Sequence, residues 1–390
     1  MSGRTQPAQT GSAPARVRVD LAADRGYDIV VGDGLIADAA TYLRPVISGG
    51  RVAVVSDETV AALHLSDLRR ALAADAIEPH EIIVPPGEPT KGFATLERLI
   101  DDLLDARIER GDTVIAFGGG VVGDLAGFAA AILRRGVAVV QIPTTLLAQV
   151  DSAVGGKTGI NTRHGKNLVG AFHQPRLVLA DIGVLDTLPR RELLAGYAEV
   201  AKYGLIGDAA FFAWLEDHGP AVCAGDQDAR RYAVVASCRA KARIVADDER
   251  ELGNRALLNL GHTFAHALEV EAGYGDRLLH GEAVAIGLAL AFELSARLGK
   301  CPAGDAERVR RHLASIGLAT DPPAAIGDGG VGRLLDHMAQ DKKVRGGRIA
   351  FVLARGIGEA YIDRDVDPAA VAALLETALA RSQAADRSRP

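Results

Sequence analysis

The chain has 390 residues, of which 48% are apolar and 24% charged, as is typical of a globular protein with a sizeable core. Its net charge of −6 argues against a nucleic-acid partner and against binding at a membrane surface. Three scattered cysteines without CxxC spacing exclude a cysteine-based zinc knuckle and suit a cytoplasmic location: Cys223, Cys238 and Cys301. Residues 1–15 are polar, lack the apolar segment of a signal peptide, and are expected to form a disordered tail.

Strand and helix patterns alternate in the first half of the chain. We predict an amphipathic helix from about 95 to 107, and strands at 51–56, 81–84, 113–117 and 137–141. This alternation predicts a parallel sheet with helices on its faces. After about residue 188 most apolar residues have helical spacing, and the run 283–292, too short to span a bilayer, predicts a buried helix. One short strand is expected at 348–353. The predicted domains are 16–189 and 190–380, followed by a tail at 381–390.

A glycine-rich turn, Gly118–Gly123, follows the predicted strand 113–117 and precedes a helix that begins near Asp124. It satisfies G-x-G-x-x-G, which lets a backbone approach a pyrophosphate at a helix N-terminus. No acidic residue follows about 20 positions later, where a dinucleotide site usually has its ribose partner. A tight strand-to-helix turn therefore remains the alternative. Other polar residues near strand ends could hold a nucleotide or merely cap turns: Asp57, Glu88, Lys91, Thr144 and Thr145.

A polar segment at 150–168 contains four glycines, two lysines and two asparagines. Gly156-Lys157-Thr158 resembles the end of a P-loop, but Ser152 occupies the position of the required earlier glycine, so a Walker A motif is excluded. We expect a flexible cationic loop suited to a phosphate or a carboxylate. A solvated loop with two surface lysines remains the alternative.

Three histidines and one carboxylate lie in apolar segments of the second half. His262 and His266 are four residues apart and would share one helix face, His280 follows, and Glu199 precedes them. His and Glu side chains are typical ligands of a metal site that has three protein ligands and one open coordination position. A single histidine in an apolar segment, however, is more often part of the core. Spacing alone places His262 and His266 together on the metal. Lys202 and Arg255 nearby indicate an anionic substrate.

These segments together resemble the 3-dehydroquinate synthase family from about residue 16 to about residue 379. The resemblance rests on several motifs at once: Pro86–Lys91, Gly118–Asp124, Ile142–Leu147, Asp151–Thr158, Gly165–Gly170, Ala198–Lys202, Asn259–His266 and Leu279–Glu282.

The resemblance implies a Rossmann-like NAD-binding domain, an α-helical metal-binding domain and an active site in the cleft between them. It implies one divalent metal, usually zinc with cobalt possible, held by Glu199, His262 and His280, so that His266 faces the substrate instead. Substrate-contacting and other active-site positions are then Arg135, Asp151, Lys157, Asn167, Lys202, Lys241, Arg255, Asn259, His266 and Lys342. Nucleotide-contacting positions are Asp57, Glu88, Lys91, Gly119, Gly120, Asp124, Thr144, Thr145, Lys157 and Lys166. Glu251 lies in a matching Asp-Glu-Arg-Glu segment.

The implied reaction converts 3-deoxy-arabino-heptulosonate 7-phosphate to 3-dehydroquinate and phosphate. It combines transient oxidation by NAD, elimination of phosphate, re-reduction and intramolecular aldol closure, in what the family implies is a homodimer. Alternatives are an amino-dehydroquinate synthase, another sugar-phosphate cyclase, a metal-dependent polyol dehydrogenase, and a non-enzymatic nucleotide-binding protein. The cyclases that make other carbocycles change residues at the Asn259 and His266 positions, and a dehydrogenase would not need the cationic cluster.

Overall fold

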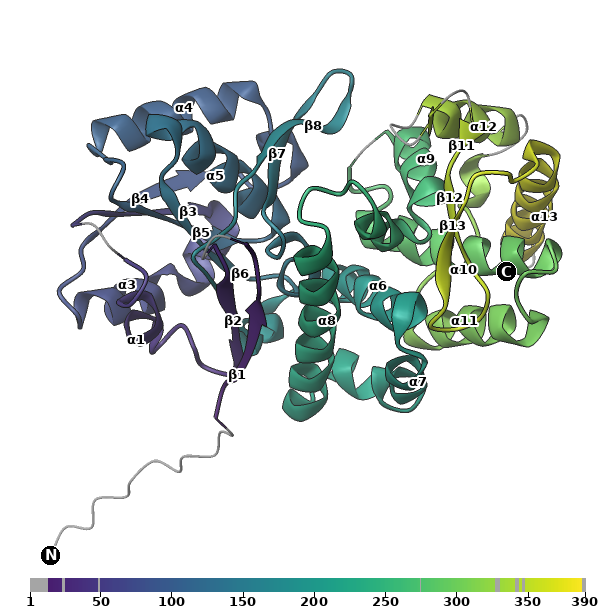
Figure 1. The fold of residues 1–390 in the computed structure, drawn as a ribbon, viewed down its shortest axis with the longest axis horizontal. Coiled ribbons are helices and arrows are strands. Elements are labelled where there is room, and N and C mark those ends of the chain that lie inside the picture. Colours follow the sequence, from purple (N-terminus) through teal and green to yellow (C-terminus); the bar gives the residue numbers. More distant parts are fainter. Residues whose placement is uncertain are drawn as a thin grey trace, which may run out of the picture.

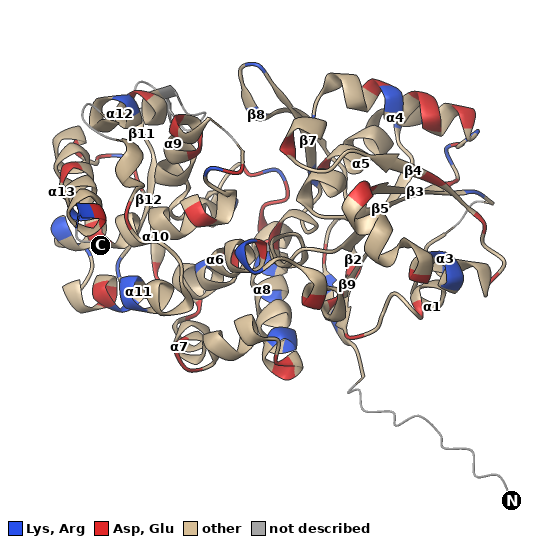
Figure 2. Cartoon of the chain, turned by 180° about the vertical axis from the view of Figure 1, so that it is seen from behind, with Lys and Arg blue, Asp and Glu red and all other residues tan. Residues whose placement is uncertain are grey.

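The computed structural model describes residues 13–22, 25–47, 50–273, 275–326, 330–340, 344–345 and 348–387. A half built on a β-sheet, purple to blue in Figure 1, is followed by a helical half, green to yellow. This arrangement confirms the predicted fold class. Figure 2 shows acidic and basic residues interspersed over both halves, in keeping with the small net charge.

A seven-stranded sheet with the order β1-β2-β9-β6-β5-β3-β4 organises the first half. Its strands are β1 (Ala15–Val19), β2 (Tyr27–Gly32), β3 (Val52–Asp57), β4 (Pro79–Val84), β5 (Thr113–Gly118), β6 (Ala138–Pro143) and β9 (Leu177–Asp181). All neighbours are parallel except β1, which is antiparallel to β2. Every residue of β3, β5 and β9 is buried, because both faces of the sheet are covered.

Helices cover the two faces of this sheet. They are α1 (Ala39–Leu43), α2 (Glu58–Val60), η1 (Ala61–Leu65), α3 (Ser66–Ala73), η2 (Glu88–Thr90), α4 (Phe93–Asp105), α5 (Gly120–Ile132) and η3 (Leu133–Arg135). Leucines of α4 and α5 share one core with β3 and β5, and leucines of α1 and α3 share a second core on the other face. The predicted helix at 95–107 is thus α4, shifted by two residues.

The polar segment at 150–168 is mostly regular structure, so the predicted flexible loop is wrong for that part. η4 (Ala148–Ser152) is followed by an antiparallel hairpin of β7 (Lys157–Thr162) and β8 (Gly165–Phe172). Ile160 is fully buried, and the Thr158 hydroxyl donates to the Ala171 carbonyl at 2.9 Å. Burial of Ile160 and pairing between β7 and β8 therefore stabilise a hairpin, which extends beyond the sheet in Figure 1.

The second half consists mainly of helices: α6 (Arg190–Gly207), α7 (Ala209–Ala224), α8 (Gln227–Asp247), α9 (His262–Ala272), α10 (His280–Arg297), α11 (Ala303–Ile316), α12 (Gly330–Gln340) and α13 (Pro368–Arg387). Short elements complete it: η5 (Ile182–Thr187), η6 (Asn254–Asn259), η7 (Ala324–Ile326), β10 (Val344–Arg345), β11 (Arg348–Ile349), β12 (Phe351–Ala354) and β13 (Ala360–Asp363). The predicted buried helix at 283–292 is the central part of α10. Across the described ranges, we find no helix of the length and apolarity needed to cross a membrane.

One continuous core joins the two halves. It contains Val17 and Ile29 of the sheet together with Tyr203 of α6 and Val234 of α8. α6 begins at Arg190, beside the predicted domain boundary, but the packing continues across it. The division into domains at residue 189 therefore stays a prediction.

The predicted tails are too long at both ends. β1 already begins at Ala15, which pairs with Val31, whereas residues 1–12 lie outside the described residues. α13 continues to Arg387, because Leu375 and Leu379 are buried and Arg381 binds Glu293 and Asp321. Residues 388–390 lie outside the described residues. The strand expected at 348–353 is divided between β11 and β12.

Candidate metal and substrate site

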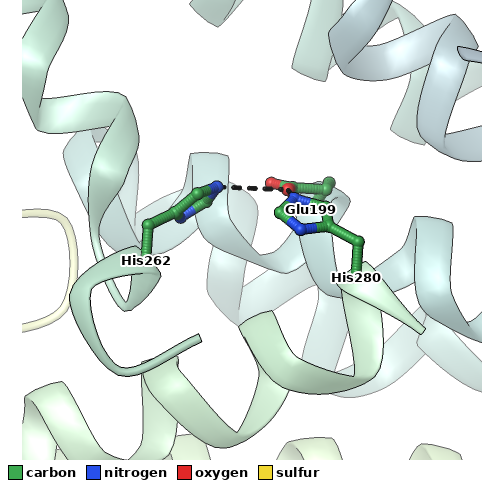
Figure 3. A group of neighbouring side chains, drawn as sticks. All are labelled: Glu199, His262 and His280. Atoms are coloured by element: carbon green, nitrogen blue, oxygen red, sulfur yellow. Dashed lines mark ion pairs between the residues drawn. The ribbon is translucent and has the colours of Figure 1, made fainter. Parts of the chain in front are cut away.

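Three side chains from three helices meet at one point. Glu199 lies in the middle of α6, His262 is the first residue of α9, and His280 is the first residue of α10. Their ligand atoms all lie within 4.8 Å of one another (Figure 3). Glu199 Oε1 is 3.6 Å from His262 Nε2 and 3.5 Å from His280 Nε2. One carboxylate and two imidazoles at such distances form the donor set of an open zinc-type site.

Close helix packing brings these residues together. At Gly261, a Cβ atom would lie 2.6 Å from the Leu288 backbone nitrogen, and φ is +78°. At Gly281, a Cβ atom would overlap the carbonyl oxygen of Ala195 in α6. Only glycine permits both approaches. Glu282 also fixes the start of α10, since its carboxylate accepts from the Leu279 backbone N–H at 2.8 Å and binds Arg191 of α6.

The outer nitrogens of both histidines have defined partners. His262 Nδ1 lies 3.1 Å from the Leu260 carbonyl oxygen, and His280 Nδ1 lies 3.1 Å from Glu269 Oε2. Both acceptors require a proton on Nδ1, so the lone pair that can bind a cation is the one on Nε2. Among the described residues, neither oxygen of the buried Glu199 carboxylate has a well-directed hydrogen bond, although Oε2 is 2.6 Å from Lys202 Nζ. The site therefore fits a divalent metal ion.

The carboxylates of Glu199 and Glu269 favour a positive charge at the centre of this cluster. Burial lowers the pKa of His280, but Glu269 and Glu199 outweigh burial and raise that pKa to about 10. Burial would raise the pKa of Glu269, yet His280 and Lys166 hold it well below its usual range. A divalent cation would balance the charge of the same carboxylates.

A chain of buried charges continues from the triad toward the sheet half. Lys202 reaches both Glu199 and Asp151, at 2.6 and 3.3 Å, and Lys241 Nζ contacts the Asp151 carboxylate. Tyr203 also donates to Asp151 Oδ1, at 3.2 Å. Burial opposes the charged form of Asp151, but Lys202 and Lys241 hold its pKa well below the ordinary value. Burial lowers the pKa of Lys241 to about 8 despite Asp151.

His266 lies beside the triad without joining it. Its ring centroid is 5.6 Å from that of His262 and 6.4 Å from that of His280, and the compact donor cluster contains neither of its nitrogens. This geometry favours the ligand set implied by the family resemblance over the one suggested by the i, i+4 spacing.

The residues expected at the substrate form two small networks. Lys157 Nζ lies 2.5 Å from Glu251 Oε2, and Asn259 donates to Glu251 Oε1 at 3.2 Å. Partial loss of solvent around the ammonium lowers the pKa of Lys157, and the attraction of Glu251 opposes this shift. Arg255 is fully buried and donates to the carbonyls of Gly155 and Glu249, at 2.9 and 2.5 Å. These contacts link the turn before β7 to the segment before α9.

The remaining substrate positions lie at unusual backbone conformations or outside the described residues. Asn167, in β8, has φ +55°, and its backbone N–H donates to Asn161 Oδ1 at 3.1 Å. Arg135, the last residue of η3, has φ +64° and directly follows Arg134 with φ +51°. Non-glycine residues with such a left-handed backbone conformation are held in it by their surroundings and often mark functional sites. Lys342 lies outside the described residues.

Most of the expected nucleotide positions lie at or after the carboxyl ends of the parallel strands, whereas Lys157 and Lys166 lie on the antiparallel β7–β8 hairpin. Gly119 and Gly120 begin α5, and Thr144 and Thr145 follow β6. Asp57 caps α2, accepting from Thr59 and Val60, so it has the structural role considered for it in the sequence. The other members pair with one another or with new partners: Lys91 with Asp124, Glu88 with Asn161, and Lys166 with Glu269.

The sequence analysis missed three residues of this region. Glu269 holds His280, Tyr203 holds Asp151, and Asn161 connects Glu88 to Asn167. Glu269 follows His262 by seven residues, two helical turns, which places both on one face of α9 and could have been recognised. The signals for Tyr203 and Asn161 depend on contacts between distant segments.

Comparisons with known proteins identify relatives over almost the full chain. Two family models match, 3-dehydroquinate synthase N-terminal at residues 81–195 and 3-dehydroquinate synthase C-terminal at residues 196–344. A 3-dehydroquinate synthase of Ruegeria pomeroyi is 62% identical over 93% of this chain and 98% of its own length. One of Rhodospirillum rubrum is 61% identical over 92% of this chain and 93% of its own.

A solved structure shares the fold. The 2-epi-5-epi-valiolone synthase ValA of Streptomyces hygroscopicus, with NAD⁺ and Zn²⁺ bound, has a TM-score of 0.83 and 32% identity. The match covers 91% of this chain and 97% of that one.

Proposed function

This chain belongs to the 3-dehydroquinate synthase family, and we propose that it converts 3-deoxy-D-arabino-heptulosonate 7-phosphate to 3-dehydroquinate and phosphate. Its cofactors are NAD and one divalent metal, zinc or cobalt, as in the relative that holds NAD⁺ and Zn²⁺. The observation that carries the proposal is the Glu199–His262–His280 donor set, joined to a buried chain of alternating charges. Such a chain suits a substrate that carries several anionic and hydroxyl groups.

The chain's own residues supply binding, orientation and charge. When bound, NAD would accept and return one hydride, and the metal would polarise substrate hydroxyl oxygens as a Lewis acid. Glu199, His262 and His280 would hold the metal, and the N-terminus of α5, with Gly119 and Gly120, would face the nucleotide pyrophosphate.

The cations divide between the two ends of the substrate. Lys157, with Asn167, would bind the phosphate, and Arg255, with Lys241, would bind the carboxylate, while His266 and Asn259 contact the substrate between them. Support comes from the carboxylates Glu251 and Asp151, which form ion pairs with Lys157 and Lys241 respectively. An anionic substrate could exchange for such internal partners without a new cation having to be recruited.

The reaction is tested with excess substrate and only trace NAD. Phosphate release should continue for many turnovers with no lasting NADH absorbance, and mass spectrometry should identify 3-dehydroquinate. Stoichiometric NADH would indicate a polyol dehydrogenase, and another carbocycle or an amino product would indicate a different cyclase.

We also propose a cytoplasmic homodimer in which Arg135 reaches the neighbouring active site. The turn at Arg134–Arg135 supports this proposal, because its backbone is fixed in place. The Arg134 carbonyl oxygen accepts two hydrogen bonds from the Arg110 guanidinium, at 3.2 and 2.9 Å. Mixing inactive Arg135→Ala and Lys157→Ala subunits should restore part of the activity. A fully active monomer in light scattering would contradict the proposal.

A further inference from the structure

Glu269 is a buried carboxylate without a role in the proposed reaction. It lies on α9, and its side chain is 3% exposed. Its two oxygens have different partners, His280 Nδ1 at 3.1 Å and Lys166 Nζ at 2.8 Å. Burying a carboxylate costs folding free energy unless it is paired, so both contacts help to stabilise Glu269 in its buried, charged form.

The contact with His280 determines which way the imidazole faces. Nδ1 points to Glu269 and Nε2 points to Glu199, at 3.5 Å, so the ring lies between two carboxylates. The bond to Glu269 requires a proton on Nδ1 and restricts rotation of the ring. Both effects present the Nε2 lone pair to the metal position.

The two histidines are held in different ways. His262 Nδ1 contacts the Leu260 carbonyl, which belongs to the backbone immediately before α9. His280, by contrast, depends on a charged side chain from another helix. That side chain also binds Lys166 of β8, so the hairpin of the sheet half contacts the carboxylate that lies behind His280.

We propose that Glu269 is a positioning residue for the metal site: it sets the tautomer and orientation of His280. The inference rests on the proposed function, which requires a metal at Glu199, His262 and His280. Partners of this kind, behind a metal ligand, typically change metal affinity about 10- to 100-fold when they are removed.

The test measures Zn²⁺ affinity by competition with a chelator and records the absorption spectrum of the Co²⁺-loaded chain. Glu269→Ala should weaken Zn²⁺ binding about 10- to 100-fold and alter the Co²⁺ spectrum. Glu269→Gln should recover part of the affinity, because its amide oxygen can still accept from Nδ1. Recovery by this isosteric variant distinguishes positioning from simple loss of packing.

Glu271→Ala is a matched control. Glu271 lies on the same helix and also pairs with an imidazole and a cation, His337 at 3.3 Å and Arg333 at 2.7 Å, but it lies outside the donor cluster. Its removal should leave Zn²⁺ affinity unchanged. Thermal unfolding of the metal-free variants shows whether the two changes cost similar stability.

Lys166→Met separates the two contacts of Glu269. It removes the hairpin contact but leaves the carboxylate on His280, so Zn²⁺ affinity should not fall. Wild-type affinity in Glu269→Ala, or an equal loss in Lys166→Met, would overturn the inference alone. Absence of tight metal binding in the wild-type chain would overturn the proposed function as well.

Discussion

The metal-ligand cluster and the substrate-binding segments differ in how they are held. Glu199 and His262 are buried at 0% and 7% exposure, and the helices that carry the three ligands touch backbone to backbone at Gly261 and Gly281. Lys157, in contrast, has a side chain that is 47% exposed, and its partner Glu251 has a left-handed backbone with φ +57°. One region is fixed by packing and the other by exchangeable ion pairs.

This difference indicates a division of labour. A rigid donor set keeps its geometry before the cofactor arrives, as a metal site requires. Ion pairs such as Lys157–Glu251 keep cations in place and can exchange partners when an anionic substrate enters. Substitutions in the first region should therefore change metal content and stability, and those in the second should change kinetics.

The largest effect is expected at the metal ligands. His280→Ala should lose nearly all bound metal, because it removes one of three donors, whereas His266→Ala should keep its metal and lose activity. Metal content after dialysis is the measurement. Equal metal loss in both variants would restore the i, i+4 ligand pair and contradict the geometry of the triad.

The next largest effect is expected when a cationic side chain that binds the substrate is removed. Lys157→Ala should lower kcat/KM on the order of 10²-fold, since the substrate phosphate loses a charged partner, with NAD affinity close to normal. Lys300→Ala, a change at an exposed lysine of the helical half, is the control. A large loss of NAD binding would instead place Lys157 on the cofactor, the second position that the family resemblance allows for it.

Helix contact should matter more for stability than for kinetics. Gly281→Ala places a Cβ atom against the Ala195 carbonyl, and overpacking of this kind typically costs about 1–3 kcal/mol of unfolding free energy. Gly304→Ala in α11 is the matched control, because its Cβ meets nothing within 4 Å and alanine favours helices. Denaturant unfolding compares the two. Equal stability would show that α6 and α10 separate easily.

The smallest effect concerns pH. Burial lowers the pKa of Lys241 to about 8, so its ammonium is present below that pH and is lost as the pH rises through it. The profile of kcat/KM, which reports the free enzyme, should fall above about pH 8 as the substrate carboxylate loses a partner. Lys241→Arg keeps its charge and should move this limb to higher pH. An unmoved limb would assign the titration to another group.

Periodicity alone identified the alternating first half and the helical second half, because strands buried on both faces are continuous apolar runs and helices repeat every 3.6 residues. The strands β1, β2 and β9 were not predicted, and the segment 150–168 was misinterpreted as a loop. The two strands of that segment, β7 and β8, are rich in polar residues and carry little periodic signal, and only pairing between them, together with packing on α5, makes them regular.

Local motifs determined which residue types could bind a metal, a nucleotide and an anion. Only the tertiary structure decided how they are combined, because α6, α9 and α10 meet through glycine contacts between segments that lie far apart in the sequence. Spacing placed His266 with His262, whereas packing selects His280. The partners that orient these groups, Glu269 for His280 and Lys202 with Lys241 for Asp151, follow from the same long-range contacts. Chemistry was therefore determined by sequence, and geometry by the fold.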